Sequence, residues 1–382
     1  MPSEIWVCLE ISTATHLDLH SRAGKFVVLL FKWINISIVL LILTLSSIAC
    51  SDEPATGPDE QYPFEAPSDT ALNPFIINES LGRGINMGNA LEAPVEGDWG
   101  VIIKDNYFTE IKNAGFQSVR IPIRWNAHAL ADSPFTIDPV IFSRVDWVLK
   151  QALENDLALI INIHHYNDIF SEPETQKTRF LSLWAQIAGH YQKYPDRVIF
   201  EILNEPHDNL TAELWNEFLA EALQVIRISN PYRTLMIGMA EWGGIAGLNK
   251  LEIPIEEQNV IVTTHYYNPF QFTHQGAEWT DGSDAWLGTT WSGTQSEKST
   301  VISDLGSVVS WGQAHNRPIN MGEFGAYSKA DMDSRVRWTN YVARQAENFG
   351  WSWHYWEFCS GFGAYDPVTE IWRNDLLKAL IP

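Results

Sequence analysis

Short apolar runs that end abruptly in polar residues recur along the chain from about residue 81. In the clearest case, the run 198–203 is followed at once by Asn204, Glu205 and Pro206. Proline cannot donate a ladder hydrogen bond, and it biases the residue before it toward an extended backbone. The pattern predicts a strand that stops here with a carboxylate at its C-terminal end, although an ordinary strand-to-loop turn has the same signature.

A second apolar run, at residues 319–322, is also followed by a glutamate, Glu323. A barrel of eight strand–helix units contains about 250 residues, so the gap from Glu205 to Glu323 fits about three units. If Glu205 follows the fourth strand, Glu323 follows the seventh. Both carboxylates then face the same mouth, because barrel active sites lie at the C-terminal ends of the strands.

Strand-like and helix-like patterns alternate through this whole region. The predicted strands cover residues 84–88, 118–123, 158–164, 198–203, 234–238, 260–265, 319–322 and 351–356. The predicted helices cover residues 107–113, 142–154, 178–194, 212–229, 298–315, 333–349 and 374–380, and the segment after the fifth strand is poorly patterned. This order predicts an α/β fold, a single (β/α)8 TIM barrel. A doubly wound open sheet is the alternative, but no Gly-x-Gly-x-x-Gly or phosphate loop follows any strand.

The N-terminal part of the chain has a different composition. Residues 26–49 are strongly apolar, follow basic residues and precede Cys50, which is typical of a secretory signal. Residues 47–50 resemble a bacterial lipobox, although Ser47 stands where leucine is usual, and the apolar length also permits an uncleaved membrane anchor. We expect residues 1–50 to be a signal, lipoprotein or membrane-anchor segment, and the protein to be secreted or lipid-anchored to the cell envelope through Cys50.

Residues 51–74 are rich in proline and acidic residues and contain no lysine or arginine. Such a composition cannot build a core and predicts an extended linker. We therefore expect the barrel domain to cover residues 75–382.

The overall composition narrows the class of ligand. The chain has 382 residues, a net charge of −22 and 17 Trp. The charge argues against nucleic acid and anionic substrates, and aromatic side chains in a cleft suit flat sugar rings, although most of the tryptophans belong in the core. The three cysteines form no disulfide framework, and the adjacent His164 and His165 lack metal-site spacing, so we expect no metal.

Polar residues gather at the predicted C-terminal ends of the strands. They are Asn86, Asn89, Glu92, Arg120, His164, His165, Asn204, Glu205, His265, Tyr267, Glu323 and Glu357, together with Trp353 and Trp356. Each one alone has a structural explanation, such as an ion pair for Arg120. Together, at six or more strand ends, they indicate an active site. The long aromatic loop 268–296 is also expected to be functional.

Six motifs occur in a specific order, namely V-R-I-P-I-R-W (119–125), I-N-I-H-H (161–165), I-L-N-E-P-H (202–207), T-H-Y-Y-N-P-F (264–270), M-G-E-F-G (321–325) and W-H-Y-W-E-F (353–358). With these motifs, the region from Leu81 to the C-terminus resembles glycoside hydrolase family 5, within the clan of retaining barrel glycosidases. G-N-A-L-E-A-P and F-T-H-Q-G-A-E-W resemble a bacterial branch that acts on β-1,4-glucans, some members of which also take β-mannans.

The resemblance implies a role for each matching residue. Glu205 matches the general acid/base and Glu323 matches the nucleophile. Asn204 matches the amide that bonds the sugar 2-hydroxyl, and Arg120 and Tyr267 match the groups that hydrogen-bond the nucleophile. His164, His265 and Trp356 match residues around the cleaved sugar. The further implied substrate contacts are Asn89, Glu92, His165, His274 and Trp279.

Physical chemistry sets the requirements for such a pair of glutamates. A retaining glycosidase needs two carboxyl groups about 5–5.5 Å apart. We expect Arg120 to keep Glu323 ionised, and we expect partial burial and the charge of Glu323 to raise the pKa of Glu205.

This chemistry requires no cofactor. We expect a monomeric endo-β-1,4-glucanase that cleaves β-glucan by a two-glutamate double displacement. The alternatives are a β-1,4-mannanase or dual glucanase/mannanase and, from another class, a non-catalytic glycan-binding lipoprotein.

Overall fold

The computed structural model describes residues 64–382, and the predictions for residues 1–63, including lipidation of Cys50, lie outside the described part. Eight parallel strands close into a barrel in sequence order, with β8 paired to β1. The strands are β1 (Arg83–Asn86), β2 (Ser118–Ile121), β3 (Ala158–Asn162), β4 (Val198–Glu201), β5 (Leu235–Ile237), β6 (Val260–Tyr266), β7 (Ile319–Phe324) and β8 (Ser352–Tyr355). All eight predicted strands and the predicted barrel are confirmed.

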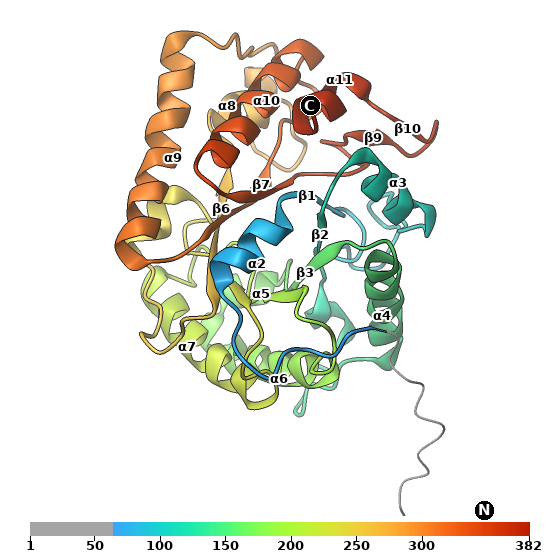
Figure 1. The fold of residues 1–382 in the computed structure, drawn as a ribbon, viewed down its shortest axis with the longest axis vertical. Coiled ribbons are helices and arrows are strands. Elements are labelled where there is room, and N and C mark those ends of the chain that lie inside the picture. The colour runs from blue at the N-terminus through green and yellow to red at the C-terminus, as the bar shows by residue number, and fades with distance from the viewer. Residues whose placement is uncertain (1–63) are drawn as a thin grey trace, which may run out of the picture. The chain divides into compact units, whose positions relative to one another are not determined.

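Helices follow the strands and surround the barrel (Figure 1). They are α2 (Pro74–Leu81), α3 (Asn106–Ala114), α4 (Pro139–Glu154), α5 (Asn167–Ser171), α6 (Pro173–His190), α7 (Ala212–Ser229), α8 (Phe270–Thr273), α9 (Gln295–His315), α10 (Met332–Asn348) and α11 (Asn374–Leu380), with 3-10 turns η2 (Trp125–His128), η3 (Ile245–Lys250) and η4 (Ser283–Trp286). Local signals in the sequence start several of these helices. At α9, for example, Thr294 and Glu297 form a reciprocal capping box.

Helix α2 closes the N-terminal end of the barrel. Its last residue, Leu81, is fully buried and packs in one apolar cluster with residues at or near the starts of the strands, including Ala158, Ile199 and Ile261. Buried polar groups at this end are paired with one another, as where Asn78 donates to the carbonyl of Ile319 and Ser118 donates to that of Leu81. The predicted site residues lie at the opposite, C-terminal mouth.

The structure also contains elements that the sequence patterns did not predict. These are α2, α5, the turns η2 to η4, the short helix α8 inside the aromatic loop, and a two-stranded hairpin of β9 (Tyr365–Asp366) and β10 (Ile371–Trp372). Part of the expected linker is also described: the backbone N–H of Ser68 donates to Asp196 at 2.8 Å, beside the start of β4. Across residues 64–382, no helix has both the length and the apolar character that crossing a membrane requires.

Candidate active site

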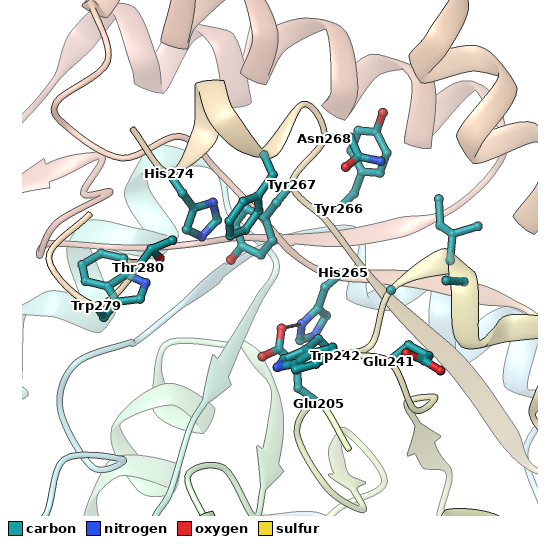
Figure 2. A pocket seen from close by; sticks show the side chains of 14 residues that line it. Glu205, Glu241, Trp242, His265, Tyr266, Tyr267, Asn268, His274, Trp279 and Thr280 are labelled. Carbon is teal, nitrogen blue, oxygen red and sulfur yellow. Dashed lines mark hydrogen bonds and ion pairs between the residues drawn. The ribbon is translucent and has the colours of Figure 1, made fainter. Parts of the chain in front are cut away.

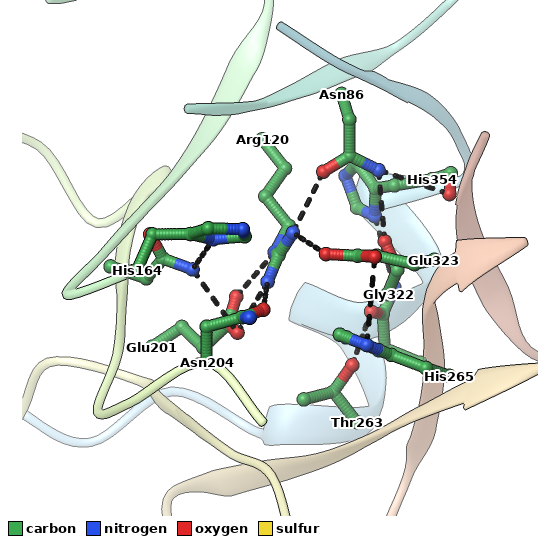
Figure 3. Close-up of polar contacts among 12 residues, drawn as sticks. Asn86, Arg120, His164, Glu201, Asn204, Thr263, His265, Gly322, Glu323 and His354 are labelled. Carbon is green, nitrogen blue, oxygen red and sulfur yellow. Dashed lines mark hydrogen bonds and ion pairs between the residues drawn. The ribbon is translucent and has the colours of Figure 1, made fainter. Parts of the chain in front are cut away.

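Arg120 lies at the centre of the barrel mouth and is fully buried (Figure 3). Its Nε and Nη2 atoms donate to the two carboxylate oxygens of Glu201, at 2.6 and 2.7 Å. Its Nη1 atom donates to Glu323 at 2.7 Å and to Asn86 at 2.9 Å, and Nη2 also donates to Asn204 at 2.7 Å. The guanidinium therefore joins strands β1, β2, β4 and β7 and fixes their side chains relative to one another.

The two strand-end glutamates have different partners. One oxygen of Glu323 accepts from Arg120, and the other accepts from the Tyr267 hydroxyl at 2.9 Å. Glu205 is bound instead by the ring of His265, whose Nδ1 lies 2.6 Å from its Oε1 (Figure 2). The side chain of Glu205 is 25% exposed and that of Glu323 only 6%, so Glu205 is the carboxyl that is open to the cleft.

The turn after β4 directs Glu205 into the mouth. Glu205 has a left-handed backbone with φ 45°, which a non-glycine residue adopts rarely and at some cost in energy. The backbone N–H of the preceding Asn204 donates to the carbonyl of Ile163, which anchors the turn to the neighbouring strand end. The predicted strand stop before Pro206 is therefore present as a tight, anchored turn, with β4 ending at Glu201. The extended backbone predicted for the residue before Pro206 is wrong, because the φ of Glu205 is positive.

The protonation equilibria of the pair differ from the prediction. Burial raises the pKa of Glu323; the charges of His265 and Arg120 oppose this rise without cancelling it, and the charge of Glu205 adds to it. Burial also acts to raise the pKa of Glu205, but the hydrogen bond and charge of His265, together with the charges of Arg120 and His207, outweigh burial and lower it. The predicted order was wrong for the free site, because His265 was expected only in the wall of the sugar site and not on Glu205.

The two glutamates lie between two cavities that form one cleft. The cavity of about 600 Å³ is lined by Glu323 and Trp356. The cavity of about 620 Å³ is lined by Glu241 and Trp242 (Figure 2). Glu205, Tyr267, His274 and Trp279 line both cavities. The cleft therefore extends to either side of Glu205, as the binding of an extended chain requires.

The structure brings most of the predicted residues to this cleft. Those that line it are Asn89, His164, His165, Glu205, His265, Tyr267, His274, Trp279, Glu323 and Trp356. The ring of Trp356 lies parallel to that of His164, with centroids 5.7 Å apart. Arg120 and Asn204 are buried beneath the surface of the cleft, where each contacts the carboxylate network.

Glu92 does not line either cavity. It is 1% exposed, and its carboxylate accepts from the backbone N–H groups of Asn89 and Ala90. Burial, opposed by these backbone hydrogen bonds, raises the pKa of Glu92 to about 8. In this structure Glu92 shapes the loop that presents Asn89.

Several residues that line the cleft were missing from the predicted set. They include Trp99, Glu241, Trp242, Tyr327, Ser360 and Phe362, six residues that lie in loops. Trp99 stands in the segment Gly97-Asp98-Trp99-Gly100, where two glycines argue against a core position. That context is a signal in the sequence that could have identified it.

One atom each from Glu205, His265 and Glu323 lies within 4.8 Å of the others, a grouping that could in principle hold a metal ion. Their donor atoms are already engaged, however, since His265 bonds Glu205 and both oxygens of Glu323 accept hydrogen bonds. The positive charge of Arg120 at 2.7 Å also opposes a second cation at Glu323. The grouping fits a pair of reacting carboxyl groups better than a metal site.

Comparisons with known proteins agree with this geometry. Residues 82–360 match the family described as Cellulase (glycosyl hydrolase family 5). Endoglucanase H of Acetivibrio thermocellus is 36% identical over 309 residues, which are 81% of this chain and 33% of that protein. Endoglucanase B of Clostridium cellulovorans is 28% identical over 324 residues, which are 78% of this chain and 72% of that protein.

A solved structure is also similar, that of Thermotoga maritima Cel5A in complex with mannotriose substrate. It is 56% identical, covers 81% of this chain and 100% of that chain, and has a TM-score of 0.80. This chain spans only a third of the length of Endoglucanase H but the whole of the Cel5A structure. Because the region that matches the family contains all eight barrel strands and both strand-end glutamates, the chain belongs to glycosyl hydrolase family 5, the cellulase family.

Proposed function

We propose that this protein is a retaining endo-β-1,4-glucanase. The observation that carries the proposal is the approach of Glu205 and Glu323, which have oxygens within 4.8 Å of each other in a cleft open on both sides. Retaining glycosidases hold their carboxyl groups about 5–5.5 Å apart, whereas inverting enzymes separate them by about 6.5–9.5 Å to admit a water molecule. The short separation supports the retaining reaction.

In the first step, Glu323 attacks the anomeric carbon while Glu205 protonates the departing glycosidic oxygen. Arg120 and Tyr267 each donate to Glu323, and these bonds aim the carboxylate and stabilise its charge. Glu205 is suited to the acid role because it is the more exposed carboxyl and lies where the two cavities meet. The products of this step are a glycosyl ester on Glu323 and a shortened chain.

In the second step, Glu205 takes a proton from water, which attacks the glycosyl ester and releases Glu323. The proton that Glu205 gave to the leaving group in the first step is thereby restored. The anomeric carbon has been attacked twice from opposite faces, so the product keeps the β configuration.

The His265 contact must change for this sequence to start. In the free site, this contact lowers the pKa of Glu205. A glycosidic oxygen that takes the place of His265 beside Oε1 of Glu205 removes that effect, while Arg120 and Tyr267 remain on Glu323. Substrate binding thereby moves the proton of the pair to Glu205.

The names of the relatives support a glucan substrate, since the two curated relatives above are endoglucanases. The mannotriose complex of the Thermotoga protein gives a specific reason to test mannan as well. The two sugars differ at the C2 hydroxyl, which is axial in mannose.

The test is a reducing-sugar assay of the full chain on carboxymethylcellulose, barley β-glucan, glucomannan and galactomannan. The matched control is Glu323→Gln, which keeps the shape of the side chain but lacks a nucleophilic oxygen. We expect hydrolysis of the first two substrates and loss of about 10⁴-fold or more in the variant. Hydrolysis of galactomannan alone would indicate a mannanase. Binding without hydrolysis on any of the four would indicate a glycan-binding protein.

We also propose that the protein is tethered outside the cytoplasm through Cys50. Support for this comes from the sequence alone, namely the basic flank, the apolar stretch 26–49 and the small residues before Cys50. Membrane fractionation of the parent and of Cys50→Ala tests it. A variant that stays in the membrane fraction as the parent does would support an uncleaved anchor instead.

A further inference from the structure

One loop in the wall of the cleft is organised around a single buried carboxyl group. Glu357, directly after Trp356, is fully buried. Its two oxygens accept hydrogen bonds from the backbone N–H groups of Cys359 at 2.9 Å, Ser360 at 2.8 Å and Phe362 at 3.1 Å. Several N–H groups that converge on the oxygens of one side chain fix the conformation of a loop. The side chain of Glu357 therefore determines the path of residues 359–362.

The same loop is held from its other side at Phe362. The carbonyl of Phe362 accepts from the Tyr355 hydroxyl at 2.8 Å and from Arg335 at 2.7 Å. The carbonyl of Gly361 accepts from the N–H of Ser328 at 3.0 Å. With both its N–H and its carbonyl bound, the backbone of Phe362 has little freedom, and its ring points in one direction.

That ring is the centre of the aromatic wall of the cleft, which we define as Tyr267, His274, Trp279, Tyr327 and Phe362. The centroid of the Phe362 ring lies 6.2 Å from Tyr267, 5.6 Å from His274, 6.1 Å from Trp279 and 5.3 Å from Tyr327. Each of the five lines the cleft. Phe362 is the one member whose ring contacts all the others within the part of the chain that the structure describes.

Two members of the wall have contacts that bear on the reaction. The hydroxyl of Tyr267 donates to Glu323. Trp279 is 61% exposed and lies in the long loop between β6 and β7, so little besides the wall holds its ring. A shift of Phe362 would therefore move both a hydrogen-bond donor of the nucleophile and an exposed surface for sugar stacking.

We propose that Glu357 and Phe362 are positioning residues: Glu357 fixes the loop, and Phe362 holds the aromatic wall so that Tyr267 bonds Glu323 and Trp279 faces the sugar chain. This inference rests on the proposed function for its kinetic consequences. Neither side chain takes part in a bond-making step. Their effect is transmitted through Tyr267 and Trp279.

The segment itself offers a matched control. Phe358 is as buried as Phe362, but its ring contacts Tyr107, Tyr365 and Trp372, which do not line the cleft. Phe358→Leu and Phe362→Leu are the same chemical change four residues apart. Both should lower the melting temperature, and only Phe362→Leu should affect the cleft.

The kinetic test compares Phe362→Leu, Phe358→Leu, Tyr267→Phe and the double variant of Phe362 and Tyr267 on cello-oligosaccharides. We expect Phe362→Leu to lower kcat/KM by about 10- to 100-fold and to move its acid limb to higher pH, as Tyr267→Phe does. The double variant should be little worse than Tyr267→Phe in kcat, because both changes affect one hydrogen bond. Fully additive effects, or a parental kcat/KM in Phe362→Leu, would overturn the proposal.

A second measurement needs no substrate. Backbone hydrogen exchange of residues 267–280 should be faster in Phe362→Leu than in Phe358→Leu, and residues 359–363 should exchange faster in Glu357→Gln than in the parent. Glu357→Gln also covers the case in which Phe362→Leu does not fold. If the parent hydrolyses no glucan, the proposed function fails, and the exchange data still decide this inference. Equal exchange in all the chains would overturn it.

Discussion

Nδ1 of His265 lies 2.6 Å from Oε1 of Glu205 and 3.7 Å from Oε2 of Glu323. The imidazole therefore contacts the expected acid directly and lies near the expected nucleophile. Nearby carboxylates favour a protonated ring, and the pKa of His265 is raised because the two glutamates outweigh the effect of burial. The proton distribution of the site thus depends on three groups rather than two.

Replacing His265 with Asn should move both limbs of the pH profile of kcat/KM to higher pH. Removing the imidazole takes away a charge that opposes the protonation of Glu205 and of Glu323, so the pKa of each carboxyl rises. Activity is lost at low pH when both carboxyls are protonated and at high pH when neither is. The profile should be measured from about pH 4 to about pH 9 with a soluble β-glucan.

His274→Asn is the control for this experiment. His274 also lines the cleft, but burial lowers its pKa to about 4, so it is largely neutral above about pH 5. Its replacement should leave both limbs in place even where kcat/KM falls. Limbs that do not move in His265→Asn would mean that His265 does not set the proton distribution.

Replacing Glu201 with Gln should strongly destabilise the fold. Glu201 and Arg120 are both buried and share two hydrogen bonds, and removing one partner of such a pair costs about 3–5 kcal/mol. Chemical denaturation measures the loss. Glu370→Gln, which removes an exposed ion pair with Lys104, should leave the midpoint unchanged. A parental midpoint in Glu201→Gln would contradict a structural role for the Arg120 network.

Much of this site could be predicted because strand ends carry clear sequence signals. The apolar runs placed Glu205 and Glu323 correctly at the C-terminal mouth of the barrel. Glu323 lies on β7 and Glu205 follows β4 by a few residues, so an apolar run with an abrupt polar ending defines both positions. The predicted roles of the individual residues remain predictions.

The loop contributions could not be predicted in the same way. Phe362 and Tyr327 follow strands at distances set by turns, and their contacts depend on tertiary packing rather than on any periodic pattern. The hydrogen bond between His265 and Glu205 joins a residue on β6 to a residue on the loop after β4. The direction of the Glu205 side chain depends on the left-handed backbone at Glu205. The pattern of apolar positions carries no information about that φ angle.

Stability should fall as pH rises through the range in which Glu92 and Glu357 ionise. Burial raises the pKa of Glu92 to about 8 and that of Glu357 to about 7, above the usual value of 4.5. Between about pH 4.5 and pH 8 the folded protein therefore binds more protons than the unfolded chain, and each unit of pKa difference corresponds to about 1.4 kcal/mol. This contribution is full below pH 4.5 and lost above pH 8.

Glu92→Gln isolates the effect, because the amide does not titrate. Between about pH 5 and pH 9, the free energy of unfolding should fall less in the variant than in the parent, by a few kcal/mol. Urea denaturation at both pH values measures this difference. The same pH dependence in both chains would show that Glu92 ionises normally in the folded protein.

Replacing Trp356 with Ala should harm catalysis far more than stability. The ring is half-buried, lines the cleft and lies parallel to His164. Trp353, three residues earlier, is fully buried and is the matched control, since its truncation should cost about 3–5 kcal/mol. Melting temperature and kcat/KM are compared for both variants. If Trp356→Ala unfolds as readily as Trp353→Ala, its ring is a core element rather than a sugar platform.

The roles of the two glutamates can be separated by the stereochemistry of azide rescue. In Glu205→Ala the proton donor is lost, so natural glucans should be cut very slowly, while a β-glycoside with a good leaving group should still form the ester on Glu323. No base then activates water, and the ester accumulates. Azide needs no base and attacks from the face that the leaving group left, so the product should be a β-glycosyl azide.

In Glu323→Ala no covalent intermediate can form. Azide should enter the space of the missing carboxylate, beside Arg120 and Tyr267, and displace an activated leaving group directly while Glu205 remains available as the acid. One displacement inverts the anomeric carbon, so the product should be an α-glycosyl azide. Nuclear magnetic resonance of the anomeric proton distinguishes the two products. The same anomer from both variants, or near-parental hydrolysis of glucan by Glu323→Ala, would contradict the assignment of Glu205 as the acid and Glu323 as the nucleophile. That assignment requires one carboxylate to attack the anomeric carbon while the other carboxyl group protonates the glycosidic oxygen from the opposite side.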